Sequence, residues 1–225
     1  MQIKKIHPWQ VSLREALALQ ERLKHKLTIS GEITSFRYVL GCDVAYGRGG
    51  IVVAAAVLMD MEKNIILEYK TATGITSFPY IPGLLAFREG PFILRALKRI
   101  RGPVDFIVFD GHGIAHPSRM GIASHIGLHI DVPSIGVAKS ILIGHADEPG
   151  RKKGEFSFIY LEEERVGVCL RTRDGVKPVY VSPGNRIGII EAKDAILKIS
   201  KHFRIPEPLR HAHMIAGMRL RALVV

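Results

Sequence analysis

The 225-residue sequence predicts an α/β fold in which helices flank a mixed sheet. Two observations carry this prediction. Apolar, β-branched runs in the first third follow one another through short turns, which is typical of antiparallel strands. In the middle third, apolar runs alternate with segments of helical spacing, which indicates parallel strands joined by right-handed crossovers. Because 47% of the residues are hydrophobic and no linker divides the chain, we expect a single domain, residues 1–225.

The first predicted elements are one helix and three strands. Apolar residues recur at near-helical spacing from Leu13 to Leu27, with charged residues between them, which predicts an amphipathic helix. Runs at Tyr38–Val44 and Ile51–Met59 flank a glycine-rich turn and predict a hairpin, and Ile65–Tyr69 predicts a third arm. Since consecutive strands usually pair, these three should lie side by side and antiparallel.

The remaining elements alternate between helices and strands. A helical repeat covers Leu84–Ile100, but Pro91 lacks an amide donor, so we expect this helix to start late or to kink. Further strands are expected at Val104–Phe109, Ser134–Ala138, Phe156–Leu161, Val166–Arg171 and Val179–Val181. Further helices are expected at Ile122–Ile130, Ile190–Lys201 and Leu209–Leu220.

The overall charge points to a polyanionic partner. The formal net charge is +11 and the sequence pI is about 9.8, so the surface should attract nucleic acid at neutral pH. A general basic bias with no such partner is the alternative on charge alone.

Cysteine usage and hydropathy indicate the compartment. Cys42 and Cys169 each lie in an apolar run without a zinc-type spacing, so both are expected to be reduced core residues. The first residues, MQIKKIHPWQ, lack the apolar region of a secretory signal, and no apolar stretch reaches the length of about 18 residues that a membrane span needs. We therefore expect a cytoplasmic protein with no membrane partner.

Two aspartates interrupt predicted strands that otherwise favour burial. Asp43 lies inside the run that begins at Tyr38, and Asp110 ends the run Phe106–Phe109. A buried lone carboxylate is costly, and two on neighbouring strands would repel each other unless a divalent cation compensated them. For either aspartate alone, a strand cap or an arginine partner is the favoured explanation, and only the two together favour a metal site.

Glu89 is the third acidic candidate, although an acid just before a predicted helix can also serve to complement the positive end of that helix. Oxygen ligands without cysteine or a dense histidine set favour Mg²⁺ or Mn²⁺ over zinc. Such a cation supports phosphodiester hydrolysis. His213, in the last predicted helix, could reach this centre.

Four segments resemble the endonuclease V family, the deoxyinosine 3′-endonucleases. They are GCDVAY at 41–46, PYIPGLLAFREGP at 79–91, FDGHGIAHPSRMGIASHIG at 109–127 and IGVAKSILIG at 135–144. The likeness runs in order from about residue 10 to residue 217. It implies a ribonuclease H-like fold and a DNA-repair enzyme that hydrolyses the second phosphodiester bond 3′ to inosine. The implied cofactor is Mg²⁺, for which Mn²⁺ should substitute, and the implied products carry 3′-hydroxyl and 5′-phosphate ends.

The resemblance also implies roles for particular residues. Asp43, Glu89 and Asp110 match the family's metal-binding acidic triad, and His213 matches its C-terminal catalytic histidine. Pro79, Tyr80, Ile81 and Pro82 match a wedge, a stiffened turn whose apolar side chains could fill the gap left when a base rotates out of the stack. The expected contacts to the extruded base and to phosphates are Gly83, Leu85, Gly111, Gly113, His116, Gly121 and Lys139.

At three positions this sequence departs from the family pattern. Ser118 stands where a basic residue is common, while Asn185 and Leu209 stand where histidine and threonine are expected. None belongs to the acidic triad, so catalysis should survive while substrate preference can shift.

Three alternatives remain open at this level. The chain could be another ribonuclease H-like nuclease that acts on RNA:DNA hybrids or branched DNA. An endonuclease V-like enzyme could also act on inosine-containing RNA. A non-catalytic module could merely hold nucleic acid on its basic surface. For the enzyme we expect a monomer that binds deoxyinosine-containing DNA.

Overall fold

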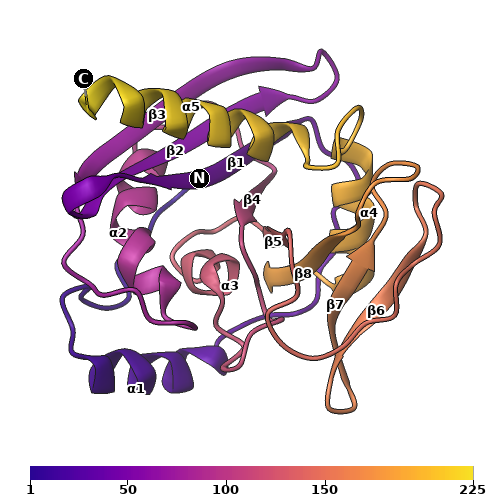
Figure 1. Ribbon diagram of the computed structural model, residues 1–225, viewed down its shortest axis with the longest axis horizontal. Helices are drawn as coiled ribbons and strands as arrows, with labels where there is room; N and C mark the ends of the chain where they lie inside the picture. The colour runs from indigo at the N-terminus through magenta and orange to yellow at the C-terminus, as the bar shows by residue number, and fades with distance from the viewer. Residues whose placement is uncertain (225) are drawn as a thin grey trace.

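The chain is built around one eight-stranded sheet, described here from a computed structural model that covers residues 1–224 (Figure 1). The strand order is β3-β2-β1-β4-β5-β8-β7-β6. The strands are β1 (Tyr38–Tyr46), β2 (Ile51–Asp60), β3 (Ile65–Ile75), β4 (Phe106–Asp110), β5 (Ser134–Ala138), β6 (Phe156–Leu161), β7 (Glu164–Leu170) and β8 (Val179–Asn185). The first three are antiparallel, β1, β4 and β5 are parallel, and β8, β7 and β6 return antiparallel. The mixed sheet predicted from the sequence is confirmed.

Helices cover both faces of this sheet, as Figure 1 shows. They are α1 (Leu13–Lys24), α2 (Leu85–Leu97), α3 (Ile122–Gly127), α4 (Ile189–Ile199) and α5 (Glu207–Val224), with a short 3₁₀ turn, η1 (Arg48–Gly50), between β1 and β2. One core cluster joins Val39 and Val108 to side chains of α4 and α5. A second joins Leu40 and Phe109 to side chains of α2 and α3. Successive residues of a strand therefore point to different helical layers.

Helix α2 begins earlier than the sequence suggested. We expected Pro91 to delay or kink the helix, and a late start is wrong because the helix already begins at Leu85 with Pro91 inside it. The helix is held by burial of its apolar face, which includes Phe87, Phe92 and Leu97. Packing of this face outweighs the loss of one backbone hydrogen bond at proline. As a result, Glu89 lies inside the helix and does not precede it.

Two of the residues that depart from the family pattern, Asn185 and Leu209, have simple structural roles. Asn185 donates to the Gly127 carbonyl at 3.0 Å and accepts from the Thr28 amide at 2.9 Å, so it ties the end of α3 and the segment that follows α1 to β8. Leu209 is buried at the start of α5.

Both cysteines are free and buried, as predicted. Within residues 1–224, none of the helices combines the length and apolar character that a membrane crossing requires.

Candidate active site

The parallel pairing of β1 and β4 places Asp43 beside Asp110. Cys42 is the register partner of Phe109, so the next residue on each strand is an aspartate. Neighbouring strands lie about 4.8 Å apart, and the two aspartates follow paired residues, so both side chains project to the face that α5 covers. The Asp43 side chain is 9% exposed and that of Asp110 is 24% exposed, which makes Asp110 the outer member of the pair.

Glu89 reaches the same strand ends from helix α2, which packs on the opposite face of the sheet. Its side chain is buried, and the Tyr46 hydroxyl donates to Oε1 at 2.7 Å. Burial raises the pKa of Glu89 to about 8 against the opposing effect of that hydrogen bond, and the charges of Asp43 and Asp110 raise it further. Glu89 therefore holds a proton near neutral pH unless positive charge is supplied.

The electrostatics of this acidic centre, defined as Asp43, Glu89 and Asp110, fit a hard divalent cation. Burial raises the pKa of Asp43, and the neighbouring Asp110 raises it further, while the Val44 amide and His213 oppose this. The carboxylates thus repel one another, and all three offer oxygen ligands, the type that Mg²⁺ and Mn²⁺ prefer. Their oxygens do not yet converge, since across residues 1–224 only a separate histidine cluster brings three ligand atoms within 4.8 Å of one another.

Two basic side chains occupy the outer side of the acidic centre. His213 on α5 lies 2.7 Å from Asp43, measured from Nδ1 to Oδ2, and its side chain is 72% exposed. The Lys139 Nζ atom donates to Asp110 Oδ2 at 2.7 Å. These two contacts engage the carboxylates that a shared cation would bind. His213 was expected to be able to reach the centre, and Lys139 was expected near the base pocket and the phosphates; in the structure both side chains contact the aspartates.

A cavity of about 240 Å³ adjoins Asp110 through the loop that follows β4. It is lined by Tyr80, Ile81, Pro82, Gly83, Leu85, Ala86, Gly111, His112, His116, Met120, Gly121, Ile122, Ser140 and Leu142. Most of the residues expected around an extruded base are among these. Gly113 is not, because its amide donates to Ser182 Oγ at 2.8 Å and a Cβ there would meet the Pro183 carbonyl at 1.9 Å. Gly113 is a close-packing position against β8.

His112 is a cavity residue that sequence reasoning did not single out. Its ring lines the cavity, and its buried Nδ1 atom has no hydrogen-bond partner within the described chain. Burial lowers the pKa of His112, and burial lowers that of His116 to about 4, so both rings are neutral at physiological pH. A neutral imidazole offers one donor and one acceptor. The position of His112, two residues after Asp110, was the available signal.

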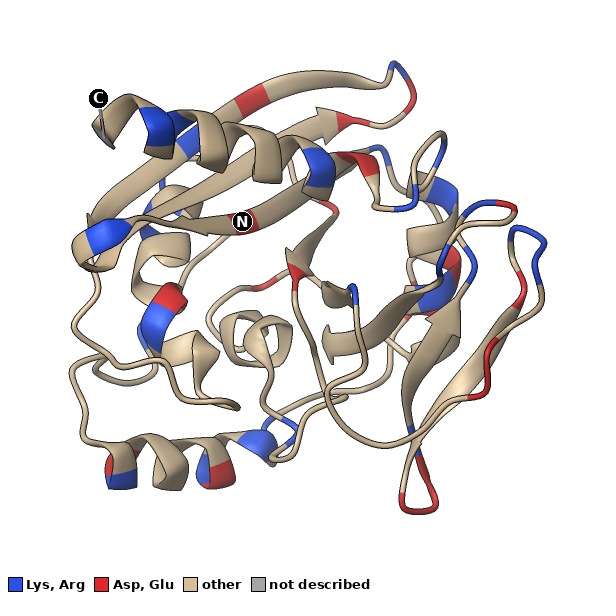
Figure 2. Cartoon of the chain, viewed as in Figure 1, with Lys and Arg blue, Asp and Glu red and all other residues tan. Residues whose placement is uncertain are grey.

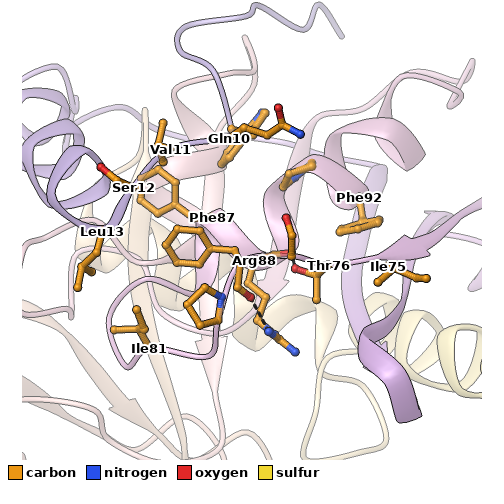
Figure 3. Close-up of a pocket in the computed structure, with 15 residues that line it drawn as sticks. Gln10, Val11, Ser12, Leu13, Ile75, Thr76, Ile81, Phe87, Arg88 and Phe92 are labelled. Atoms are coloured by element: carbon orange, nitrogen blue, oxygen red, sulfur yellow. Dashed lines mark hydrogen bonds between the residues drawn. The ribbon is translucent and has the colours of Figure 1, made fainter.

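The predicted wedge lies at the rim of the cavity. Tyr80 is 71% exposed, and Ile81 lines both this cavity and a second one of about 550 Å³. Figure 3 shows the second cavity with Phe87 and Arg88 at its centre. There the Arg88 guanidinium donates to the Phe78 carbonyl at 2.6 Å, which fastens the wedge turn to helix α2.

The Ser118 departure is accommodated within the protein. Its hydroxyl donates to Gln20 Oε1 at 3.0 Å and also lies 3.1 Å from His116 Nδ1. The neighbouring Arg119 pairs with Glu164. Ser118 therefore joins the cavity loop to helix α1, and Arg119 is engaged with β7.

Comparison with known proteins identifies the family. A family model described as Endonuclease V matches residues 19–214. The chain belongs to the endonuclease V family. Endonuclease V from Dictyoglomus turgidum is 45% identical over 208 residues, covering 92% of this chain and 91% of the relative. Endonuclease V from Thermosipho melanesiensis is 43% identical over 213 residues, which cover 95% of this chain and 93% of the relative. This chain is accordingly a nuclease.

Solved endonuclease V structures share the whole fold. The crystal structure from Streptomyces avermitilis has a TM-score of 0.92 and 38% identity, with full coverage of both chains. Endonuclease V of Ciona intestinalis has a TM-score of 0.82 and 28% identity and covers 94% of this chain and 98% of its own. It was solved in complex with a 24mer DNA containing an inosine followed by a ribo-adenosine.

Proposed function

We propose that this chain is a DNA-repair endonuclease of the cytoplasm that acts as a monomer through one domain, residues 1–225. It recognises deaminated adenine by extruding inosine and hydrolyses the second phosphodiester bond on its 3′ side. The products carry 3′-hydroxyl and 5′-phosphate ends. The observation that carries the proposal is the juxtaposition of the acidic centre and the 240 Å³ cavity in an endonuclease V fold. A related endonuclease V binds inosine-containing DNA.

Asp43, Glu89 and Asp110 would hold Mg²⁺, with Mn²⁺ as a substitute. When bound, the ion activates water and neutralises charge on the phosphate. Tyr46 fixes Glu89 through its 2.7 Å hydrogen bond, which orients the carboxylate from outside the centre. His213, at 2.7 Å from Asp43 and largely exposed, is placed to carry a proton between the reacting phosphate and solvent.

Lys139 supports phosphate binding at the same edge. Its ammonium lies at Asp110 and is half exposed, so it can turn to a backbone phosphate once a cation compensates the carboxylate. Lysine and arginine residues occur along the helices and the connecting loops (Figure 2). The net charge of +11 favours attraction to the nucleic-acid backbone.

The cavity would hold the extruded hypoxanthine. Gly111 and Gly121 are expected contacts to the base, but their backbone amides already donate to the carbonyls of Val137 and Gly113 at 3.0 and 3.1 Å. The side chains of His112 and His116 are better placed, because a neutral imidazole can donate to O6 and accept from N1–H. Gly83, with a φ of +83°, has an ideal Cβ position 3.5 Å from His116, so any side chain there would narrow the cavity.

A nicking assay tests the proposal. Matched duplexes with one inosine or one adenine are labelled at the 5′ end and incubated with the enzyme and Mg²⁺. We expect one cut, at the second bond 3′ to inosine, that a chelator abolishes. Equal cleavage of both duplexes would reject lesion specificity and favour another ribonuclease H-like nuclease. Binding without any cleavage would favour a non-catalytic module.

Inosine-containing RNA is a second candidate substrate. The specific observation is that the solved Ciona intestinalis complexes contain a ribo-adenosine directly after the inosine. The extruded base is the same in DNA and RNA, so only contacts to the 2′-hydroxyl can separate the two. Cleavage rates on inosine followed by deoxyadenosine, inosine followed by ribo-adenosine, and an all-RNA strand would rank them directly.

A further inference from the structure

A second group of potential metal ligands lies apart from the acidic centre. His7 comes from the segment that precedes α1, His125 lies in α3, and His129 follows that helix. All three side chains are buried. A ligand nitrogen from each ring lies within 4.8 Å of the other two. This histidine cluster contains none of the residues assigned to phosphodiester hydrolysis.

Proton positions in the cluster follow from its outer hydrogen bonds. His7 Nδ1 lies 2.7 Å from the Pro8 carbonyl, and His129 Nδ1 lies 2.8 Å from the Lys4 carbonyl. A carbonyl only accepts, so both Nδ1 atoms carry their protons. In neutral rings the Nε2 atoms of His7 and His129 are then bare lone pairs.

The three Nε2 atoms that face one another do not have enough protons to form hydrogen bonds between all of them. His7 Nε2 lies 2.7 Å from His125 Nε2 and 3.4 Å from His129 Nε2. Only His125 can supply a proton, to His7, and its own buried Nδ1 then accepts from nothing in the described chain. His7 and His129 meanwhile face each other as two acceptors. Burial lowers the pKa of all three rings, so extra protonation does not resolve this conflict near neutral pH.

The surroundings are those of a nitrogen-liganded metal site. The Nδ1–H groups of His7 and His129 donate to carbonyls, as the second nitrogen of a metal-bound histidine usually does. Trp9 stacks on His125 and His129 with ring centroids 5.3 and 5.1 Å apart, and Phe87 packs edge-on against His125 at 4.9 Å. Imidazole ligands without oxygen or sulfur favour zinc and its neighbours over Mg²⁺.

We propose that His7, His125 and His129 bind one zinc-class transition-metal ion, which fastens the N-terminal segment to helix α3. Zinc–nitrogen bonds of about 2.0–2.1 Å require only small rotations of rings already this close. Three protein ligands leave a fourth position for a small ligand such as water, so the affinity should be lower than in four-ligand structural sites.

The proposed ion would act on the architecture around the cavity. The segment after His7 leads into α1, where Gln20 donates to the carbonyls of Gly83 and Met120 at 2.8 and 3.3 Å. Helix α3 directly follows the loop that contains His116 and Gly121. Metal binding would therefore stabilise the wall of the cavity without taking part in hydrolysis.

The test uses the tag-free full-length chain carrying Asp43→Ala and Asp110→Ala, which removes the competing acidic centre. After treatment with a chelator and dialysis against Zn²⁺, elemental analysis should find about one zinc per chain. Zinc at roughly 100 times its Kd should raise the unfolding midpoint by about 5–10 °C. Co²⁺ in its place should give the visible absorption of a low-coordinate nitrogen site.

Single substitutions locate the ion. His129→Phe, which keeps an aromatic ring in the cluster, and His7→Phe should each weaken zinc binding at least about ten-fold and abolish the thermal shift. His25→Gln, at an exposed histidine, is the matched control and should bind zinc like the parent. A parent that binds no zinc overturns the proposal whether or not the variants fold. Zinc retained in full by both variants overturns it as well. Neither result depends on nicking activity, so the proposed function is judged separately.

Discussion

The acidic centre and the histidine cluster show two ways in which one fold gathers ligand atoms. In the acidic centre, the carboxylates from strands β1 and β4 and helix α2 are each bonded to a different partner, His213, Lys139 and Tyr46. In the histidine cluster, nitrogen donors already lie within 4.8 Å of one another in an apolar enclosure. Charged ligands repel and need a counterion before they converge, whereas neutral imidazoles can be packed together by burial alone.

Loss of one aspartate should give the largest effect. Asp110→Ala or Asp43→Ala should lower the nicking rate on inosine DNA by about 10³-fold or more, because the hard cation loses a ligand and the phosphate loses its compensation. Binding of the duplex should be largely retained, as a gel-shift assay would show. Asp131→Ala, at an exposed aspartate, is the control. A nicking rate near wild type in either variant would place the chemistry elsewhere.

The acidic centre should make the metal-free protein less stable as the pH rises. The pKa of Glu89 is about 8 in the folded chain against an ordinary value of 4.5, so between these values the folded chain holds a proton that the unfolded chain has released. The contribution of the protonated Glu89 to the free energy of unfolding is fully present below pH 4.5. It falls by up to about 1.4 kcal/mol per pH unit towards pH 8. Urea unfolding in a chelator measures this. Glu89→Gln should flatten the slope, and an unchanged slope would contradict the assignment.

The histidine cluster should give the opposite slope. Burial lowers the pKa of His129 from 6.5 to about 4, so the unfolded chain takes up a proton first on acidification. The contribution of this histidine is present above pH 6.5 and is lost as the pH falls towards 4, by up to about 1.4 kcal/mol per unit. The difference in unfolding free energy between wild type and His129→Phe should therefore shrink in acid. A constant difference would mean that His129 is not buried as a neutral ring.

Tyr80→Ala should have the smallest effect and spare both ligand groups. The side chain is 71% exposed, so stability should hardly change. Loss of a stacking surface is worth about 1–3 kcal/mol, so inosine cleavage should fall roughly ten-fold at limiting enzyme. Tyr69→Ala, at an exposed tyrosine of β3, provides the comparison. If Tyr80→Ala discriminates inosine from adenine as wild type does, the wedge assignment fails.

The two ligand groups also differ in how far the sequence reveals them. Asp43 and Asp110 stand out because each interrupts an apolar strand, and parallel pairing of those strands brings them together. His125 and His129 have the i, i+4 spacing of metal ligands on a helix, but His7 lies 118 positions before His125, so only the docking of the N-terminal segment on α3 reveals the third ligand. Side-chain clusters made by loop docking have no periodic signal in a sequence.

The same distinction applies to the fold. Hydrophobic periodicity predicted most of the strands and helices, because it reflects which face is buried. It missed residues 70–75 of β3, which end at the exposed Ile75, and Pro91 wrongly suggested a late start for α2. In both places tertiary pairing or packing outweighs the local preference. The antiparallel return of β8, β7 and β6 likewise depends on pairing that no local pattern specifies.

Crystals of the chain with an inosine duplex, grown in Mn²⁺, would test the acidic centre most directly through anomalous scattering. We predict an anomalous peak bound by oxygens of Asp43, Glu89 and Asp110 and facing a phosphate 3′ to the inosine. A DNA-bound structure with no manganese at these carboxylates would contradict the assignment.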